Sequence, residues 1–243
     1  MKIILFITML CSIAIEGIAL TESTNRTKAD TLKGVEEKRN LLKRRMDLQG
    51  ASQLPYEFPN YNGEYKKIYG LTGLEITTCI AQYIYIDLNR QKRSSKSLGC
   101  SLISHFDVKN KNFTPIFLSW NNAPCDFRGL LVTLDTNYQI IDTLEVAIAG
   151  NHEDRILTKQ YQLDTDLTLI VYDLRPTSDK ILRYQMDQID TYDAQRVDTH
   201  YKIDDNGKFI KLKEIFYKPK TYTIEELYYY KNHRIGNGKE EKL

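Results

Sequence analysis

The sequence is poor in the features that assign most chains to a functional class. Lysine and arginine number 34 against 32 for aspartate and glutamate, and this balance excludes the strongly basic footprint of a nucleic-acid-binding protein. After the first residues, no apolar run approaches the roughly 18 residues of a membrane-spanning helix, so we expect none in the mature chain. The patterns of a nucleophile elbow, a zinc protease, a phosphate-binding loop and a calcium loop are missing. No catalytic residue is therefore predicted from a local motif.

Cysteine is scarce too, and its spacing excludes a familiar metal site. Once the leader described below is removed, three cysteines are left, Cys79, Cys100 and Cys125. None forms the paired C-x-x-C unit that places two thiolates of a zinc site on one turn. An oxidising compartment would allow one disulfide and leave one thiol. Cys100 alternates with leucines, which favours a small buried residue over a disulfide. We expect neither a metal nor a cofactor.

A secretory leader is the clearest feature present. Lys2 precedes the apolar stretch from Ile3 to Ile15, and Gly17-Ile18-Ala19 offers small residues to a signal peptidase. The pattern predicts a signal peptide over residues 1–19 and an exported chain that is periplasmic, secreted or held at the cell surface. A lipid anchor on Cys11 is the alternative. It is disfavoured because Leu10 occupies the position where a small residue is required.

Residues 20–50 are charged and predicted to be partly helical. Leu32, Val35, Leu42 and Met46 share one face of a helix, and the cations at 43–45 suit its C-terminal end. A membrane-surface or partner-binding helix is one interpretation. A solvated tether between leader and domain is the interpretation that the composition favours.

Residues 51–217 are predicted to form an antiparallel β domain. Proline and glycine punctuate 51–70, and apolar residues then recur with period two in segments joined by polar turns. The predicted strands cover 76–88, 98–106, 114–120, 130–134, 140–148, 157–163, 167–171, 197–203 and 210–216. The fold class is mainly β, an antiparallel meander arranged as a sandwich or partly open barrel, with an N-terminal helical tether and a short C-terminal helix.

Two local patterns make this prediction specific. Turns rich in Asp and Asn are expected at 135–137, 164–166 and 204–207, and both Asn206 and Gly207 accept a positive φ. Alternation predicts that Leu98, Cys100, Leu102 and Phe106 share one face of a strand, and that Thr114, Ile116, Leu118 and Trp120 share one face of the next.

The last segment, residues 218–243, is expected to be a short helix followed by a disordered tail. Thr223 and Glu226 have the spacing of a capping box for a helix running to His233, and Leu227 and Tyr230 would pack. Residues 239–243 are predicted to be disordered.

Histidine and acidic residues are the remaining candidates for chemistry. His105 and His200 fall on predicted strands, and His152-Glu153-Asp154 forms a compact cluster in a predicted loop. An imidazole beside a carboxylate can perform acid–base work or hold a metal. None of these residues has a partner at ligand spacing, so solvated strand and loop residues are the favoured interpretation. Four scattered carboxylates, Asp164, Asp166, Asp173 and Asp179, also lack a ligand pattern.

The strand–turn–strand units at 131–144 and 199–209 resemble those of many uncharacterised exported bacterial proteins. In such proteins a signal peptide precedes a domain of paired strands, and a tyrosine-lysine-isoleucine hairpin comparable to 201–203 ends the sheet. The resemblance spans Leu98 to Phe216. It implies a periplasmic or outer-surface location, no established activity and no catalytic residues to carry over. This chain lacks the well-placed lipidation cysteine that many of them have.

Two functional hypotheses follow. The first is a non-enzymatic binding domain for a protein or glycan at the cell surface, motivated by the leader, the hairpins and the 17 tyrosines. Its aromatic candidates are Tyr83, Tyr85 and Trp120. The second is a periplasmic hydrolase-type enzyme whose histidines and carboxylates converge from distant strands. Neither hypothesis fixes an oligomeric state.

Overall fold

A computed structural model of the chain describes residues 36, 40–58, 69–71, 99–123, 126–150, 157–177, 191–223, 225–227, 235 and 241–243. The eleven strands belong to one antiparallel sheet that is not closed into a barrel. Their bounds are β1 Tyr56–Phe58, β2 Tyr69–Leu71, β3 Gly99–His105, β4 Phe113–Ala123, β5 Asp126–Asp135, β6 Ile140–Gly150, β7 Leu157–Leu163, β8 Thr168–Pro176, β9 Thr191–Ile203, β10 Phe209–Phe216 and β11 Lys220–Thr223.

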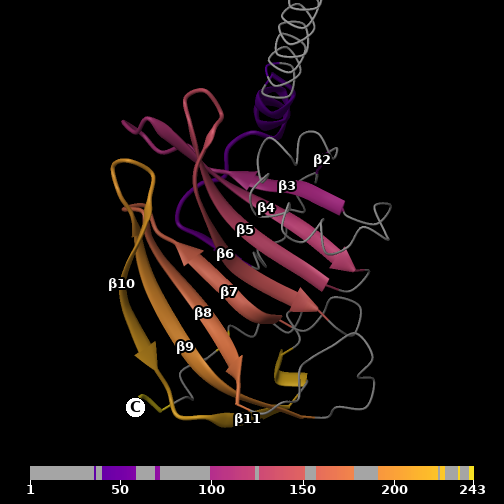
Figure 1. Ribbon diagram of the computed structural model, residues 1–243, viewed down its shortest axis with the longest axis vertical. Coiled ribbons are helices and arrows are strands. Elements are labelled where there is room, and N and C mark those ends of the chain that lie inside the picture. The colour runs from indigo at the N-terminus through magenta and orange to yellow at the C-terminus, as the bar shows by residue number, and fades with distance from the viewer. Residues whose placement is uncertain are drawn as a thin grey trace, which may run out of the picture.

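The sheet is a meander, as predicted. From β2 to β10 each strand pairs with the next along the chain, while β1 adds to β7 and β11 adds to β9. The strands curve strongly around one another (Figure 1). Because neighbours run antiparallel, the connections β3–β4, β5–β6, β7–β8 and β9–β10 all lie at the same end of the sheet. The predicted strands from residue 98 onward are confirmed, and the one at 76–88 lies outside the described residues.

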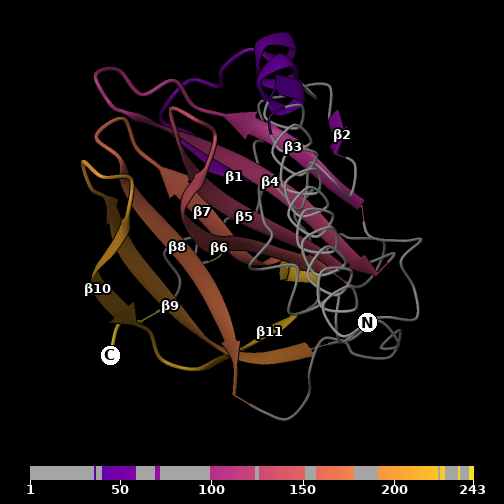
Figure 2. The same cartoon turned by 45° about the horizontal axis from the view of Figure 1, so that its top comes forward.

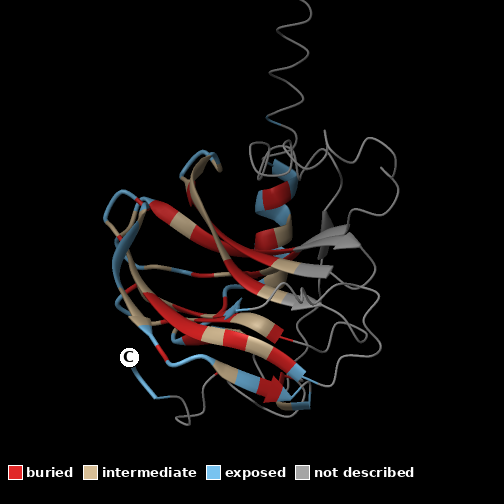
Figure 3. Cartoon of the chain, turned by 60° about the horizontal axis from the view of Figure 1, so that its bottom comes forward, coloured by how far each residue is buried: buried red, intermediate tan, exposed pale blue. Residues whose placement is uncertain are grey.

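The main core lies on the concave side of the curved sheet. Its largest buried members are aromatic. The ring of Tyr161 contacts that of Phe117, and the ring of Phe106 contacts that of Tyr56, each with ring centroids 5.0 Å apart. Buried positions follow the middle of the strands, and the hairpin turns are exposed (Figure 3). The rest of this core includes Phe113, Leu131, Val146, Leu163, Leu169, Val171 and Ile203.

One face prediction is wrong, and a β-bulge is the reason. The register of β3 on β4 shifts between Leu102 and Ser104. An extra residue in a strand reverses the alternation beyond it. Leu102 therefore packs against the N-terminal helix, whereas Phe106 packs in the concave core with Tyr56. The face shared by Ile116 and Leu118 is confirmed, because both lie in the helix-covered cluster.

The N-terminal helix is confirmed over residues 40–49, but that part is not a solvated tether. Leu42 is 1% exposed and Met46 is 6% exposed. Both pack on the convex face of β3 to β5 against Leu118, Leu130 and Val132. Figure 2 shows the helix standing beside β3. The described part of the apolar stripe, Leu42 and Met46, therefore covers the sheet, and Lys43 and Arg44 are exposed.

The structure describes the start of the predicted C-terminal helix. A 3₁₀ turn occupies Glu225–Leu227, and the predicted capping box forms, with Glu226 N–H donating to Thr223 Oγ1 at 3.2 Å and Thr223 N–H to Glu226 Oε2 at 2.8 Å. Leu227 is buried as expected, and residues 228–234 lie outside the described part.

The prediction of a disordered tail is wrong for residues 241–243. Lys218 N–H donates to Glu241 O at 2.7 Å, and Leu243 N–H donates to Phe216 O at 3.0 Å. These backbone hydrogen bonds hold the three residues as a short ladder against the end of β10. Composition alone predicts a disordered, charged tail, because it carries no information about hydrogen bonds between the tail and the residues at the end of β10.

The leader and the lipidation candidate Cys11 fall within residues 1–35, which lie outside the described part. Within the part described, no helix is long and apolar enough to cross a membrane.

Candidate functional site

The hairpin turns at the common end of the sheet share one geometry. In those that begin at Asp135, Asp164 and Asp204, the aspartate N–H donates to the carbonyl four residues later at 2.8–3.0 Å. Its own carbonyl accepts the N–H three residues later at 2.9–3.0 Å. That third residue has a positive φ: 59° at Tyr138, 68° at Leu167 and 79° at Gly207. The three turns therefore have the same backbone conformation and the same hydrogen bonds.

This geometry corrects the expected form of the Asn-Gly turn. Gly207 has a positive φ but Asn206 does not, so the connection is a type I turn closed by a left-handed residue rather than a two-residue mirror-image turn. Asp204 Oδ1 accepts the N–H of Asn206 at 2.9 Å and that of Lys208 at 2.8 Å. The sequence places this aspartate correctly at the start of the turn. Its side-chain hydrogen bonds stabilise the turn that ends in the left-handed Gly207.

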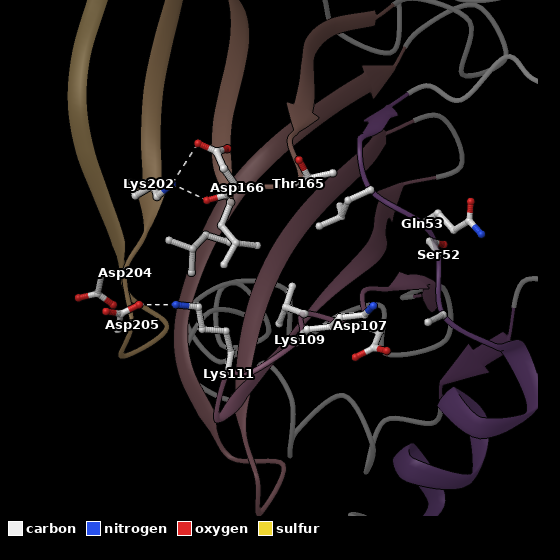
Figure 4. A pocket seen from close by; sticks show the side chains of 15 residues that line it. Ser52, Gln53, Asp107, Lys109, Lys111, Thr165, Asp166, Lys202, Asp204 and Asp205 are labelled. Carbon is white, nitrogen blue, oxygen red and sulfur yellow. Dashed lines mark hydrogen bonds and ion pairs between the residues drawn. The ribbon is translucent and has the colours of Figure 1, made fainter.

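A groove of about 1120 Å³ opens where the β3–β4, β7–β8 and β9–β10 connections meet the segment before β1 (Figure 4). The walls come from 51–54, from 107–111 between β3 and β4, from the β7–β8 turn and from the end of β9 with its following turn. Its floor is apolar: Leu167 and Ile203 are buried, and Leu54 and Val108 are half-buried. The strained left-handed conformation of Leu167 directs a large apolar side chain to this floor, where most left-handed turns carry Gly or Asn.

The rim of the groove carries both signs of charge. Three lysines and four aspartates line it: Lys109, Lys111, Lys202, Asp107, Asp166, Asp204 and Asp205. Lys202 Nζ donates to the carbonyl oxygen of Asp166 and lies 3.2 Å from its Oδ2. Lys111 pairs with Asp205 and so joins the β3–β4 connection to the β9–β10 turn. Asp107 and Lys109 are exposed and form no ion pair with any described residue.

Hydrogen bonds favour the ionised form of two carboxylates on the rim. The N–H of Thr168 donates to Asp166 Oδ1 at 2.9 Å and its hydroxyl to Oδ2 at 2.8 Å. These two hydrogen bonds, with a smaller effect of Lys202, lower the pKa of Asp166 below its usual range. The hydrogen bond and charge of Lys111 likewise lower the pKa of Asp205. These interactions therefore favour the ionised carboxylates of Asp166 and Asp205 on the rim.

The two histidines predicted on strands, His105 and His200, are not part of this groove. His105 ends β3 and His200 lies on β9, and neither lines the groove. Burial lowers the pKa of His200, and the nearby Lys213 adds to this effect. The carboxylate nearest in sequence, Asp198, is held by Arg196 and Tyr217. His152, Glu153, Asp154 and Asp179 lie outside the described residues.

Metal ligation has no support in the part of the chain that the structure describes. Among those residues, no group of three or more His, Cys, Asp or Glu side chains is placed to hold an ion. Of the three cysteines that follow the predicted leader, Cys79 and Cys125 lie outside that part, and only the backbone of Cys100 is described. Of the aromatic candidates, Tyr83 and Tyr85 also lie outside it, and Trp120 is described by its backbone alone.

A second set of charges crosses the sheet from β5 to β10, and each member lies beside an opposite charge. Consecutive members alternate in sign with nitrogen–oxygen distances of 2.7 to 3.8 Å. Because each charge already has an opposite neighbour, this ladder is a structural network. Its members are Arg128, Glu145, Lys159, Asp173, Arg175, Glu214 and Lys211.

Sequence reasoning located the turns and missed the groove. The available signal was the clustering of Lys and Asp in connections that a meander brings to one end, at 107–111, 164–166 and 202–205. Strand order alone places those connections together.

Comparisons with known proteins supply no further guide. No protein-family model, no curated protein and no solved structure matches this chain. The function is therefore argued from the groove.

Proposed function

We propose that this chain is an exported, non-enzymatic binding domain whose groove receives a charged, extended segment of a partner protein at the cell surface. The observation that carries the proposal is the groove itself: an apolar floor bounded by a rim of fixed positive and negative charges. Sites of this kind hold a ligand by burying its apolar part and orienting its polar groups.

The lining favours a polypeptide over a glycan. Sugar rings are commonly held against aromatic faces, and none of the residues that line the groove is aromatic. Its volume of about 1120 Å³ exceeds the roughly 300–1,000 Å³ of ordinary small-molecule pockets. A segment that carries both acidic and basic side chains can pair with Lys109 and Asp107, which are exposed on the same connection.

Site-specific photocrosslinking tests the proposal. A benzophenone amino acid is placed at Thr165, which is exposed on the rim, and at Leu48, which is 64% exposed on the helix as a control. Expression in the native host should give an adduct from the Thr165 position alone, and its tryptic peptide should contain residues of both charge signs.

A synthetic form of that peptide then allows quantitative measurement. Calorimetry should show about tenfold weaker binding by the Lys109→Glu variant, because one close charge pair becomes a repulsion, and unchanged binding by Lys43→Glu on the exposed helix face. Equal adducts from Thr165 and Leu48, or equal affinity of both lysine variants, would overturn the proposal. Crosslinking to a glycan instead would show that the ligand is a glycan rather than a protein.

The exported location is tested separately by intact mass and cell fractionation. A mature chain that begins at Leu20 in the soluble exported fraction supports a free domain. An acylated Cys11 in the membrane fraction would replace it with a surface-anchored domain.

A further inference from the structure

The β10 strand (Phe209–Phe216) is an outer edge of the sheet, and its apolar residues are unusually exposed. It pairs with β9 along one side. Ile210 is 46% exposed, Leu212 58% and Phe216 40%. Half of the large hydrophobic side chains that are exposed in the described part of the chain therefore lie on this one strand. Scattered single apolar residues are ordinary, whereas three on one edge strand indicate a docking surface or an aggregation hazard.

Both ends of this edge are already occupied. At the start, Phe209 N–H donates to Asp142 Oδ2 at 3.0 Å. At the other end, Phe216 O accepts the N–H of Leu243, and Lys218 N–H donates to Glu241 O. These contacts show which backbone groups point away from β9, and they show that the edge accepts a strand.

The middle of the edge is open among the described residues. Because outward-pointing backbone groups alternate along a strand, and because the register shifts between Lys211 and Lys213, the outward groups belong to Lys211 and Glu214. No described strand pairs with them. A segment of a few residues would complete the ladder between the two occupied ends.

The charges on this edge select the occupant. Lys208, Lys211 and Lys213 are exposed, and the acid of the strand, Glu214, is already bound by Arg175 and Lys211. A second copy of the chain would bring an edge with the same excess of lysines against these lysines, and like charges held close together destabilise a strand pair. An extended segment that carries acidic and apolar residues pairs its carboxylates with the lysines and covers the apolar side chains.

We propose that β10 is a second docking surface, which captures an acidic, extended segment of a partner protein by strand addition. The bulge and the lysines, which protect an edge from indiscriminate pairing, here restrict pairing to acidic strands. This surface is independent of the groove, since none of its residues lines the groove.

The test uses the full mature chain and a capped peptide of alternating glutamate and valine, about as long as the 8 residues of β10. Hydrogen exchange followed by NMR should show slowed exchange at the amides of Lys211 and Glu214 when the peptide is present. A peptide in which lysine replaces glutamate should not slow exchange there.

Variants sharpen the result. Leu212→Glu should weaken peptide binding about fivefold through repulsion and lost apolar contact, while Leu48→Glu, at an equally exposed leucine of the helix, should have no effect. Deletion of 241–243 should tighten binding, because Phe216 O and Lys218 N–H become available to the added strand.

Four outcomes would overturn the proposal. They are protection elsewhere than β10, equal binding of the lysine peptide, indifference to Leu212→Glu, and a concentration-dependent dimer in sedimentation that protects β10 without peptide. The last of these would identify a second copy as the occupant.

Discussion

Replacement of Asp198 by alanine should strongly destabilise the domain. Arg196 and Asp198 lie two residues apart on one face of β9, with Arg196 Nε and Nη2 donating to the two carboxylate oxygens at 2.7 and 2.8 Å. The two residues are only 6% and 4% exposed. The Tyr217 hydroxyl donates to Asp198 Oδ2 at 2.8 Å, and the guanidinium lies 4.5 Å from the Tyr217 ring centroid and 5.3 Å from that of Tyr172.

The magnitude follows from the charge that is left behind. Removing one partner of a buried ion pair costs about 3–5 kcal/mol, because the other charge stays buried after it loses its opposite charge. A domain of this kind has a total free energy of unfolding of about 5–15 kcal/mol. Tyr217→Phe removes one hydrogen bond to a charged acceptor and should cost less, about 1.5–3 kcal/mol. Replacing Arg196 and Asp198 together by leucine should recover most of the loss.

Urea unfolding measures these differences. Trp120 is the single tryptophan of the sequence, so its fluorescence and the far-ultraviolet circular dichroism provide two probes. Asp107→Ala is the control, since Asp107 is exposed and forms no ion pair with a described residue. The reasoning is refuted if Asp198→Ala costs no more than this control, or if the double leucine variant is as unstable as Asp198→Ala.

Three further predictions concern the ladder, the core and the helix. Hydrogen bonds from Lys211 and then Arg175 lower the pKa of Glu214 to about 2. A folded pKa below the ordinary value of 4.5 gives stability above that pH, so the advantage over Glu214→Gln, about 1–2 kcal/mol with solvent screening, should vanish as pH falls from about 5 to 2. Gly129→Ala would place a Cβ 2.6 Å from Phe117 Cε2, and chemical denaturation should show a loss of about 1–3 kcal/mol. Leu42→Ala should cost about 2–5 kcal/mol in the same assay, because the side chain is 1% exposed against the sheet.

Matched variants control these experiments. Glu36→Gln, at an exposed glutamate, should show no such loss between pH 5 and 2, and a constant gap for Glu214→Gln over that range would contradict the assignment. Phe117→Leu should partly rescue Gly129→Ala by making room for the Cβ, so additive losses would count against a steric cause. Leu41→Ala changes a 41% exposed neighbour of Leu42. Equal small effects at the two leucines would mean that the helix does not pack on the sheet.

The local features of this fold could be predicted from the sequence, because they depend on residues close together in the chain. Alternating apolar residues identified β3 to β10 but not β11, and aspartates identified the turns at 135, 164 and 204. The capping box of Thr223 and Glu226 was read from spacing alone. Side-chain periodicity and turn hydrogen bonding act over a few residues, so such patterns carry the information directly.

What only the tertiary structure decided involves residues brought together by the sheet. The bulge near Ser104 sends Leu102 and Phe106 to different faces, and no local pattern announces it. The groove needs four segments, and the Lys111–Asp205 ion pair joins residues 94 positions apart. The ordered tail at 241–243 depends on an edge supplied by β10. Strand register and the curvature of the sheet determine each of these features. Both depend on contacts between residues far apart in the chain, so no short stretch of sequence can predict them.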